Sequence, residues 1–365
     1  MHFNPTNPLI VQGDGSILLE VQTERYEEAR DLLSRFAELE KSPEHMHTYR
    51  ITPLSLWNAA AAGLGAEGIV AGLTGLSKYD LPRNVPDDIR ETIGRFGKVV
   101  LLAGDPGPNG EPMLRLTVAD DSVARRIAST PKVHTLTAGA EREGCFRVPL
   151  ANRGIIKQAL LKLGYPVEDR AGFVRGTHLQ IGVRPHALSG APFALRRYQR
   201  EAVEVWHKDG AIEGGHGVVV LPCGAGKTIV GIATMVATSC QTLILATGVS
   251  AVRQWIDEIL DKTDLTPADV GEYSGAAKQI RPVTVTTYQI LTHRPSRDVD
   301  FTHLGLFTAN DWGLIIYDEV HLLPAPVFRI TADIQARRRL GLTATLVRED
   351  GREGDVFSLI GPKRY

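Results

Sequence analysis

The feature that most constrains the fold of this chain is a series of five short apolar runs in its second half. Each run is about five residues long, ends in a polar segment, and is separated from the next by a stretch that includes an amphipathic helical pattern. The runs are residues 217–221, 242–246, 283–287, 313–317 and 339–343. This alternation is typical of a parallel sheet with helices on both faces. Because ligands bind beyond the carboxyl ends of such strands, the five polar ends predict one binding rim.

Length and composition limit the classes of protein to consider. With 365 residues the chain is long enough for two or three domains, and 43% hydrophobic with 23% charged residues is a globular composition. No stretch approaches the roughly 18 apolar residues of a membrane span, and the first residues lack the layout of an export signal. We therefore expect a cytoplasmic protein that does not contact a membrane. A net charge of −1 means that any contact with DNA must come from local basic clusters and backbone amides.

Cysteine spacing excludes two further classes. Cys145, Cys223 and Cys240 form no C-x-x-C pair. We expect neither a disulfide framework nor a thiolate zinc site.

The part of the chain before the apolar runs predicts two smaller domains. Residues 1–105 read as a mainly helical accessory domain, with a β-hairpin around Asp14, a helix over 24–40 and a helix capped at Thr52. The Gly- and Pro-rich residues 103–112 predict a linker. Residues 113–185 alternate strand and helix patterns and predict a small α+β domain, and residues 193–365 form the α/β domain with the parallel sheet.

The stretch "LPCGAGKT", residues 221–228, has the composition of a phosphate-binding loop. It lies between a strand and a helix, where glycines let the backbone approach phosphate and the helix N-terminus favours anions. Lys227 can reach the β and γ phosphates of ATP, and the hydroxyl of Thr228 can coordinate Mg²⁺. The residues expected to contact the nucleotide are Pro222, Cys223, Gly224, Ala225, Gly226, Lys227 and Thr228. Leu221 stands where such loops usually have their first glycine, but the strand and helix on either side favour a nucleotide site.

The run "GLIIYDEVH" ends in the carboxylates that such a loop requires. Asp318 is expected to hold the Mg²⁺ shell, and Glu319 to orient or deprotonate the attacking water. His321 would mean little alone, because isolated histidines are mostly structural.

Taken together, "DEVH" and "LPCGAGKT" resemble the motifs of superfamily 2 helicases, whose phosphate loops commonly lack the first glycine. The remaining polar segments are similar to the family's motifs in order: residues 195–203 with the adenine-recognition glutamine Gln199, 246–255 with motif Ia, 286–291 with motif Ib, and 341–345 with motif III. Arg348, Glu349 and Asp350 resemble the RED signature of the XPB family of DNA repair and transcription helicases. The chain is identified as a member of that family, of the bacterial type.

The resemblance implies a RecA-like ATP-binding domain with catalytic Lys227, Asp318, Glu319 and His321. It implies residues that couple the nucleotide to DNA or contact the DNA, namely Thr287, Tyr288, Thr343, Thr345, Arg348, Glu349 and Asp350. It further implies 3′–5′ polarity, a role in DNA repair, and backbone contacts to single-stranded or forked DNA. By position, residues 1–105 correspond to the family's N-terminal domain and 113–185 to its damage-recognition-like domain.

Motifs of a second RecA-like lobe do not occur in the sequence, so we expect the front half of a helicase. Such a half should bind ATP·Mg²⁺, hydrolyse it poorly by itself and not unwind DNA, because the second lobe supplies an arginine finger. Its expected partners are DNA and a repair nuclease or second helicase lobe.

Two other functions compete with this hypothesis. The first is an ATP-responsive DNA or protein scaffold that does not turn over. The second is a small-molecule kinase, which the order of the motifs disfavours. Arg253 and residues 337–339 could contact phosphate or equally be solvated surface charges.

Overall fold

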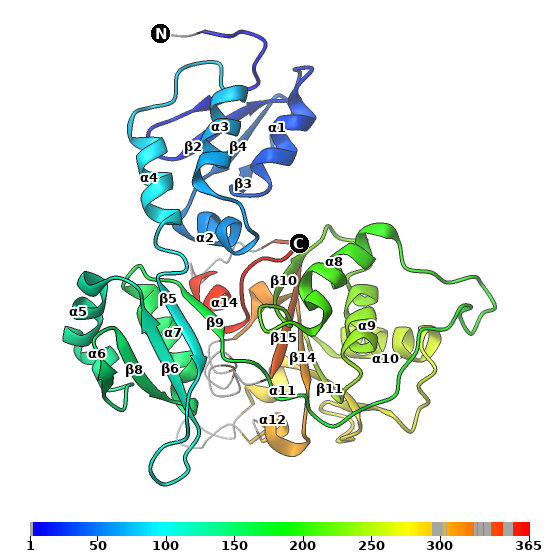
Figure 1. Ribbon diagram of the computed structural model, residues 1–365. Helices are drawn as coiled ribbons and strands as arrows, with labels where there is room; N and C mark the ends of the chain where they lie inside the picture. The colour runs from blue at the N-terminus through cyan, green and yellow to red at the C-terminus, as the bar shows by residue number, and fades with distance from the viewer. Residues whose placement is uncertain are drawn as a thin grey trace. The chain divides into compact units, whose positions relative to one another are not determined.

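The computed structural model describes residues 3–293, 302–303, 305–324, 327, 331, 337–345 and 353–365 of the chain (Figure 1). The chain divides into two compact units. The first comprises Met1–Val99 with Gly164–Glu168, and the second Val100–Leu163 with Asp169–Tyr365.

The first unit packs helices against an antiparallel sheet of order β1-β2-β4-β3. Its strands are β1 (Leu9–Val11), β2 (Ser16–Glu20), β3 (Glu38–Lys41) and β4 (Met46–Arg50), and its helices are α1 (Tyr26–Leu33), α2 (Pro53–Ala61), α3 (Ala66–Leu76) and α4 (Asn84–Ile93). The expected hairpin is present, with Gly15 at φ +83° in its turn, and so is the Thr52 cap on α2.

The helix expected over residues 24–40 ends at Leu33, and residues 38–41 instead form the edge strand β3. Its sequence, ELEK, does not alternate cleanly between apolar and polar residues, so only backbone pairing with β4 defines it as a strand. Among the described residues, no single helix is long and apolar enough to cross a membrane; α2 and α3 pass that test only as a pair bent by 114°.

A five-stranded sheet of order β7-β8-β6-β5-β9 follows along the chain. Its strands are β5 (Val99–Ala103), β6 (Met113–Val118), β7 (Ala140–Arg142), β8 (Cys145–Pro149) and β9 (Val167–Arg170), and the helices α5 (Asp121–Ser129), α6 (Pro131–His134) and α7 (Arg153–Lys162) lie between them in sequence.

Residues 103–112 are not the interdomain linker that their composition suggests. They connect the neighbouring strands β5 and β6, and the Gly104 N–H donates to the Met113 carbonyl at 3.1 Å. Glycine and proline suit a hairpin loop as well as a linker, and the pairing of the flanking strands decides between them. The compact units divide after Val99, and the separation of a small α+β domain from the domain with the parallel sheet stays a prediction.

The third sheet has six parallel strands in the order β10-β15-β14-β11-β13-β12. The five apolar runs form β10 (His216–Val220), β11 (Thr242–Ala246), β13 (Val283–Thr287), β14 (Leu314–Asp318) and β15 (Arg338–Thr343). The sequence did not indicate the sixth strand, β12 (Val270–Tyr273), which is short and lies at the edge of the sheet. Helices α8 (Arg197–His207), α9 (Lys227–Thr238) and α10 (Val249–Lys262) pack against this sheet.

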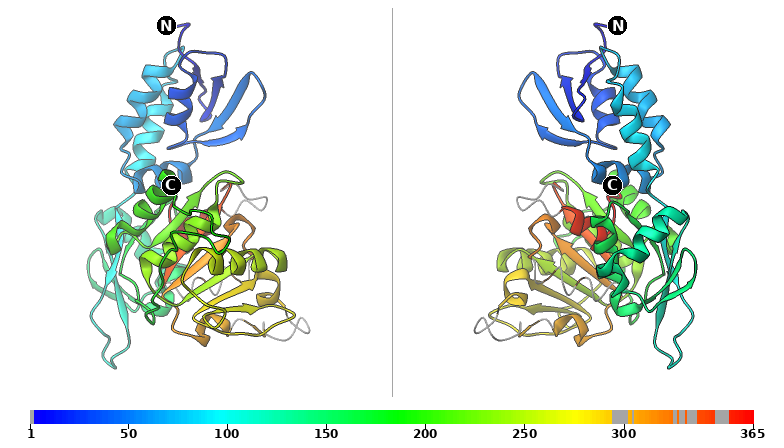
Figure 2. Two further views of the ribbon diagram at one scale, coloured as in Figure 1. Left: turned by 90° about the vertical axis from the view of Figure 1, so that its right-hand side faces the viewer. Right: turned by 90° about the vertical axis from the view of Figure 1, so that its left-hand side faces the viewer.

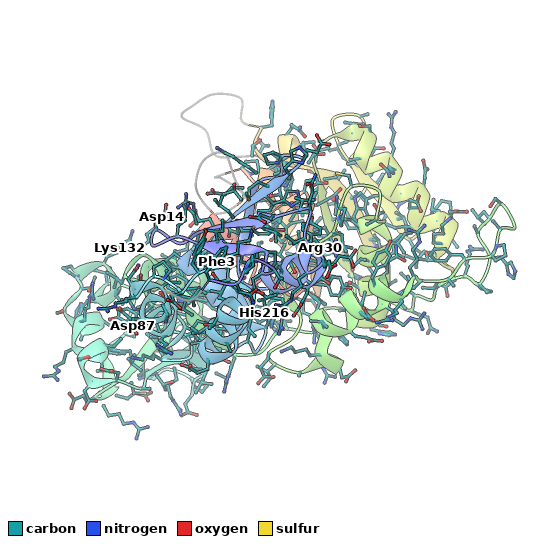
Figure 3. All side chains as sticks on the ribbon, turned by 90° about the horizontal axis from the view of Figure 1, so that it is seen from above. Phe3, Asp14, Arg30, Asp87, Lys132 and His216 are labelled. Atoms are coloured by element: carbon teal, nitrogen blue, oxygen red, sulfur yellow. The ribbon has the colours of Figure 1, made fainter. Side chains whose placement is uncertain are left out.

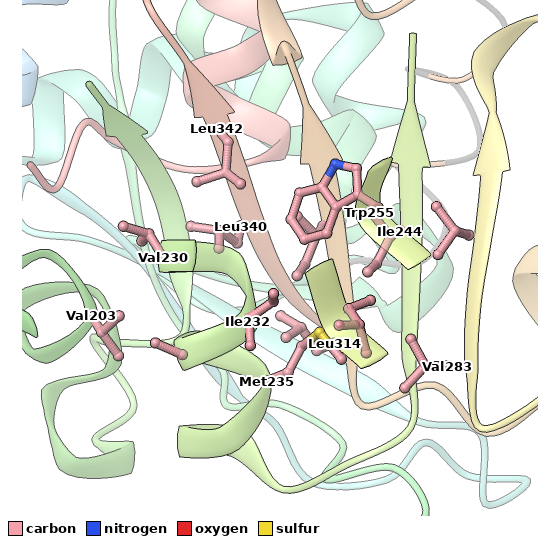
Figure 4. Close-up of a cluster of buried hydrophobic side chains, with 14 of the residues drawn as sticks. Val203, Val230, Ile232, Met235, Ile244, Trp255, Val283, Leu314, Leu340 and Leu342 are labelled. Atoms are coloured by element: carbon pink, nitrogen blue, oxygen red, sulfur yellow. The ribbon is translucent and has the colours of Figure 1, made fainter. Parts of the chain in front are cut away.

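Successive residues of these strands contribute to apolar clusters on opposite faces of the sheet. Ile244 and Ile316 belong to the cluster under α9 and α10, which Figure 4 shows, while Leu243 and Ile315 belong to the other. Strands buried on both faces explain the nearly continuous apolar runs. All the parallel strands therefore end at one edge of the sheet, where the polar segments follow.

A buried group of charges joins α7 to the parallel sheet. Asp169 accepts hydrogen bonds from Arg153 Nη2 at 2.8 Å and from Lys157 Nζ at 2.7 Å, and all three side chains are buried. The guanidinium groups of Arg153 and of Arg339, on β15, lie 5.4 and 5.7 Å from the ring centroid of Phe173. The imidazole of His216, labelled in Figure 3, lies 5.4 Å from the same ring.

A second contact of α7 reaches the helix α14 (Glu353–Leu359), where Gln158 Nε2 donates to Asp355 Oδ1 at 2.8 Å. The two helices lie side by side (Figure 2). α7 therefore packs on the part of the chain that forms the parallel sheet, through both polar and charged contacts.

We expect Asp169→Asn to destabilise the second unit by about 3–5 kcal/mol, because the buried Arg153 and Lys157 would lose the carboxylate that pairs with both of them. Burial alone would raise the pKa of Asp169, but the charges of Lys157 and Arg153 outweigh it and hold that pKa well below its usual value. The measurement is the urea midpoint by tryptophan fluorescence, since Trp206, Trp255 and Trp312 all lie in this unit.

The matched control is Asp105→Asn, which breaks an ion pair with Arg115 whose carboxylate is 91% exposed. This variant should unfold at the midpoint of the unmodified chain. Equal midpoints for the two variants would contradict the role assigned to Asp169.

Candidate active site at the carboxyl ends of the parallel strands

The loop between β10 and α9 takes a backbone path that depends on glycine. Gly224 and Gly226 have φ values of +77° and +78°, in the left-handed region. A Cβ on Gly226 would lie 2.7 Å from Nε2 of Gln199. The helix α9 begins at Lys227, directly after Gly226, so its free N–H groups face the loop. Such an arrangement suits an anion.

Two residues of α8 hold this loop from the other side. Nε2 of Gln199 and the hydroxyl of Tyr198 donate to the carbonyl of Ala225 at 3.1 and 2.7 Å. Oε1 of Gln199 accepts the Arg196 N–H at 2.9 Å. The buried amide of Gln199 therefore connects α8 to the loop. Tyr198 has the same contact, although sequence reasoning assigned it no role.

The central contact of the site joins Lys227 to Glu319. Nζ of Lys227 lies 3.2 Å from Oε1 of Glu319, and the two side chains are 12% and 27% exposed. Glu319 follows β14 with φ +48°, a strained value for a residue with a side chain. Within the described part of the chain, its other oxygen, Oε2, is buried and accepts no hydrogen bond, although Nδ1 of His321 lies 3.5 Å away. A buried acceptor in this position fits a bound water.

Asp318 is held at three atoms. Its Oδ1 accepts the Glu319 N–H at 3.1 Å, its Oδ2 accepts Nε1 of Trp255 at 2.9 Å, and its carbonyl accepts the hydroxyl of Tyr288 at 2.8 Å. Burial raises the pKa of Asp318, and the hydrogen bond from Trp255 opposes that increase. A partly buried carboxylate beside Glu319 is a favourable ligand for a divalent cation.

A second chain of hydrogen bonds runs from His321 to the end of β15. Nδ1 of His321 lies 2.8 Å from Oγ1 of Thr343. That hydroxyl donates to the carbonyl of Thr345 at 2.5 Å and accepts the Thr345 N–H at 3.1 Å. Because the hydroxyl proton is already engaged, Nδ1 of His321 is the donor in the first contact. The segment with Asp318, Glu319 and His321 is therefore connected to the residues after β15.

Other residues singled out from the sequence differ in exposure. Pro222, Cys223 and Gly224 are exposed in the loop, while Ala225 and Thr228 are half-buried. Thr287 and Tyr288 are buried, and the Thr287 hydroxyl caps α11 (Tyr288–Leu291) by accepting the Ile290 N–H at 3.2 Å. Arg348, Glu349 and Asp350 lie outside the described residues.

The basic residues considered for phosphate contacts also differ in exposure and in their contacts. Arg253 is exposed on α10, which leaves its predicted contact open. Arg337 donates to the Trp312 carbonyl and pairs with Asp311, and Arg338 lies 5.9 Å from the Phe173 ring centroid. The structure contradicts a phosphate contact for Arg339, because this residue is fully buried and its Nε donates to the Leu359 carbonyl at 2.7 Å.

Two family models match the chain. The helicase conserved C-terminal domain matches residues 9–141, and the type III restriction enzyme res subunit matches residues 192–348. Among solved structures, the chain is similar to the UvsW helicase of bacteriophage T4, with a TM-score of 0.43 and 15% identity over 73% of this chain and 99% of that one.

Curated relatives match almost the whole chain. It is 52% identical to the DNA 3′-5′ helicase XPB of Kineococcus radiotolerans and 50% identical to that of Mycobacterium tuberculosis, over 98% of this chain in both cases. The chain spans 61% and 62% of the length of these two proteins. It is also 32% identical, over 99% of its length and 53% of the relative's, to the XPB helicase/translocase subunit of the general transcription and DNA repair factor IIH of Encephalitozoon cuniculi. With about half of its residues identical to two bacterial XPB helicases along nearly its whole length, the chain belongs to the XPB helicase family.

Proposed function

We propose that the chain carries the ATP- and DNA-binding part of an ATP-dependent DNA helicase or translocase that acts in DNA repair with 3′–5′ polarity. The observation that carries the proposal is the contact between Lys227 and Glu319 at the rim of the parallel sheet. It joins a phosphate loop to an acidic segment that is distant in sequence. Relatives named as DNA 3′-5′ helicases support the reaction and its polarity.

The nucleotide would bind along the loop that follows β10. The N–H groups at the start of α9 would face the phosphates, and Lys227 would leave Glu319 to contact them. Gln199 would recognise the adenine from its place against the loop. Pro222 to Gly226 would complete the phosphate cradle.

Thr228 and Asp318 would hold the Mg²⁺ ion that accompanies ATP. Bound Mg²⁺ neutralises charge on the phosphates. Glu319 would orient the attacking water through the buried oxygen that accepts no hydrogen bond within the described residues.

The contacts of His321 with Thr343 and Thr345 would couple the nucleotide to DNA. They extend from beside Glu319 to the residues that precede Arg348, Glu349 and Asp350, for which we propose a role at the strand-separation edge. Thr287 and Tyr288 would contribute to this coupling through their buried contacts. We further propose the cytoplasm as location, backbone contacts to single-stranded or forked DNA, and a repair nuclease or a second helicase lobe as partner.

Two substitutions separate binding from hydrolysis. Lys227→Ala should weaken binding of a fluorescent ATP analogue by about 10-fold or more, because it removes a charged hydrogen-bond donor to phosphate. Glu319→Gln should keep that affinity and lower the single-turnover rate of phosphate release by about 10²-fold or more, because it removes the base. The assays are fluorescence anisotropy and release of labelled phosphate, with protein in excess and single-stranded DNA present.

Lys41→Ala serves as the control, because Lys41 is an exposed lysine of β3. It should match the unmodified chain in both assays. Tight ATP binding without any phosphate release, with or without DNA and in both the unmodified chain and Glu319→Gln, would favour the non-hydrolysing scaffold instead.

Cys223 reports on the loop directly. It is exposed, whereas Cys145 and Cys240 are buried, so a maleimide should modify Cys223 first. Saturating ATP·Mg²⁺ at 100 times its dissociation constant should slow that reaction up to about 100-fold, since only the free loop reacts. The rate is measured by mass spectrometry of the modified peptide.

In Cys223→Ala, the fast reaction should disappear, and the remaining slow labelling should not respond to ATP. Labelling of Cys223 at the same rate with and without nucleotide would show that the phosphates bind elsewhere.

A further inference from the structure

The indole of Trp255 contacts the carboxylate at the end of β14. Its Nε1 donates to Oδ2 of Asp318 at 2.9 Å, and the residue is 1% exposed. Trp255 lies on α10, which follows β11, the strand next to β14 in the sheet. The helix that follows the neighbouring strand, α10, therefore contacts the predicted metal ligand Asp318 through one donor atom.

The other tryptophans of the chain provide an internal comparison. The indoles of Trp57, Trp206 and Trp312 donate to the backbone carbonyls of Thr92, Arg339 and Leu306. A buried indole N–H needs an acceptor, and a backbone carbonyl serves for these three. Trp255 donates instead to a carboxylate, which makes a stronger, charge-assisted hydrogen bond.

The helix that begins at the phosphate loop makes room for this ring. A Cβ on Gly231 of α9 would lie 2.4 Å from Cη2 and 3.0 Å from Cζ3 of Trp255. Glycine inside a helix costs about 1 kcal/mol relative to alanine, so a packing reason for it is expected. The indole lies in the apolar cluster with Val230 of α9 and with Leu342 (Figure 4), and its N–H contacts Asp318.

These contacts restrict the rotation of the Asp318 carboxylate. One oxygen accepts the Glu319 N–H and the other accepts the indole, while Tyr288 holds the carbonyl of the same residue. Each carboxylate oxygen has a second lone pair that can bind a cation. The indole therefore orients the group without occupying all of its ligand positions.

We propose that Trp255 is a positioning residue that holds the Asp318 carboxylate in the orientation in which it binds the Mg²⁺ accompanying the nucleotide. The inference rests on the function proposed above. Loss of a hydrogen-bond partner of a metal ligand typically weakens metal affinity or activity 10- to 100-fold. Removal of the indole N–H should thus weaken metal-dependent binding and spare the contacts that need no metal.

The test compares Trp255→Phe with the matched control Trp206→Phe, which removes the same N–H from another buried indole whose acceptor is a backbone carbonyl. The dissociation constant of a fluorescent ADP analogue is measured with Mg²⁺ and with EDTA. Trp255→Phe should bind with unchanged affinity in EDTA and lose about 10-fold or more of the tightening by Mg²⁺. Trp206→Phe should keep both values.

Indole N–H signals in a ¹H–¹⁵N spectrum give a second readout that does not depend on turnover. Four such signals are expected, and Trp255→Phe identifies the one from Trp255. Addition of ADP and Mg²⁺ to the unmodified chain should shift this signal more than the other three. If Trp255→Phe does not fold, benzothienylalanine at position 255 replaces the N–H by sulfur and keeps the ring shape.

Equal tightening by Mg²⁺ in Trp255→Phe and in the unmodified chain would overturn the proposal, as would a Trp255 signal that does not respond to ADP and Mg²⁺. If the unmodified chain binds ADP without any effect of Mg²⁺, or does not bind it, the proposed function itself fails, and this inference fails with it. The two failures are distinguished by the unmodified chain alone.

Discussion

The ion pair between Lys227 and Glu319 depends on one constraint, the common direction of the strands in the parallel sheet. In the register of this sheet, Val220 pairs with Thr343 and Leu342 pairs with Asp318. The strands β10, β15 and β14 therefore end at the same edge of the sheet. Residues that follow these strands meet at one edge although they are far apart in sequence. The nucleotide, metal and coupling roles proposed for them require that edge.

Electrostatics then restricts what the edge can bind. Asp318 and Glu319 place two carboxylates beside one ammonium group, and the helix α9 directs its N-terminus to the same place. Burial raises the pKa of Asp318, so its ionised form is costly without a cation. The Glu319 carboxylate is the counter-ion of the Lys227 ammonium, and another anion such as a phosphate can replace it. A phosphate chain supplies the anion for Lys227, and a divalent cation balances the charge of Asp318. The phosphate alone or the cation alone would satisfy only one of these two groups.

Much of this arrangement is predictable from sequence, because its causes are local. Five of the six parallel strands follow from apolar runs buried on both faces, and the glycine positions in the loop follow from the backbone that a phosphate site requires. Contacts set by tertiary packing were missed. The edge strands β3 and β12 are defined by their neighbours, and residues 103–112 become a hairpin loop only because β5 pairs with β6. Likewise, no local pattern distinguishes the buried Arg339 from a surface arginine. Trp255 did carry a signal, since a buried indole at the end of a motif needs an acceptor.

A crystal structure of the chain with Mg²⁺ and a non-hydrolysable ATP analogue tests the central claim most directly. The account predicts that Nζ of Lys227 leaves Glu319 for the terminal phosphates and that the metal lies between Thr228 and Asp318. A nucleotide bound away from residues 222–228, with the ion pair between Lys227 and Glu319 intact, would contradict it.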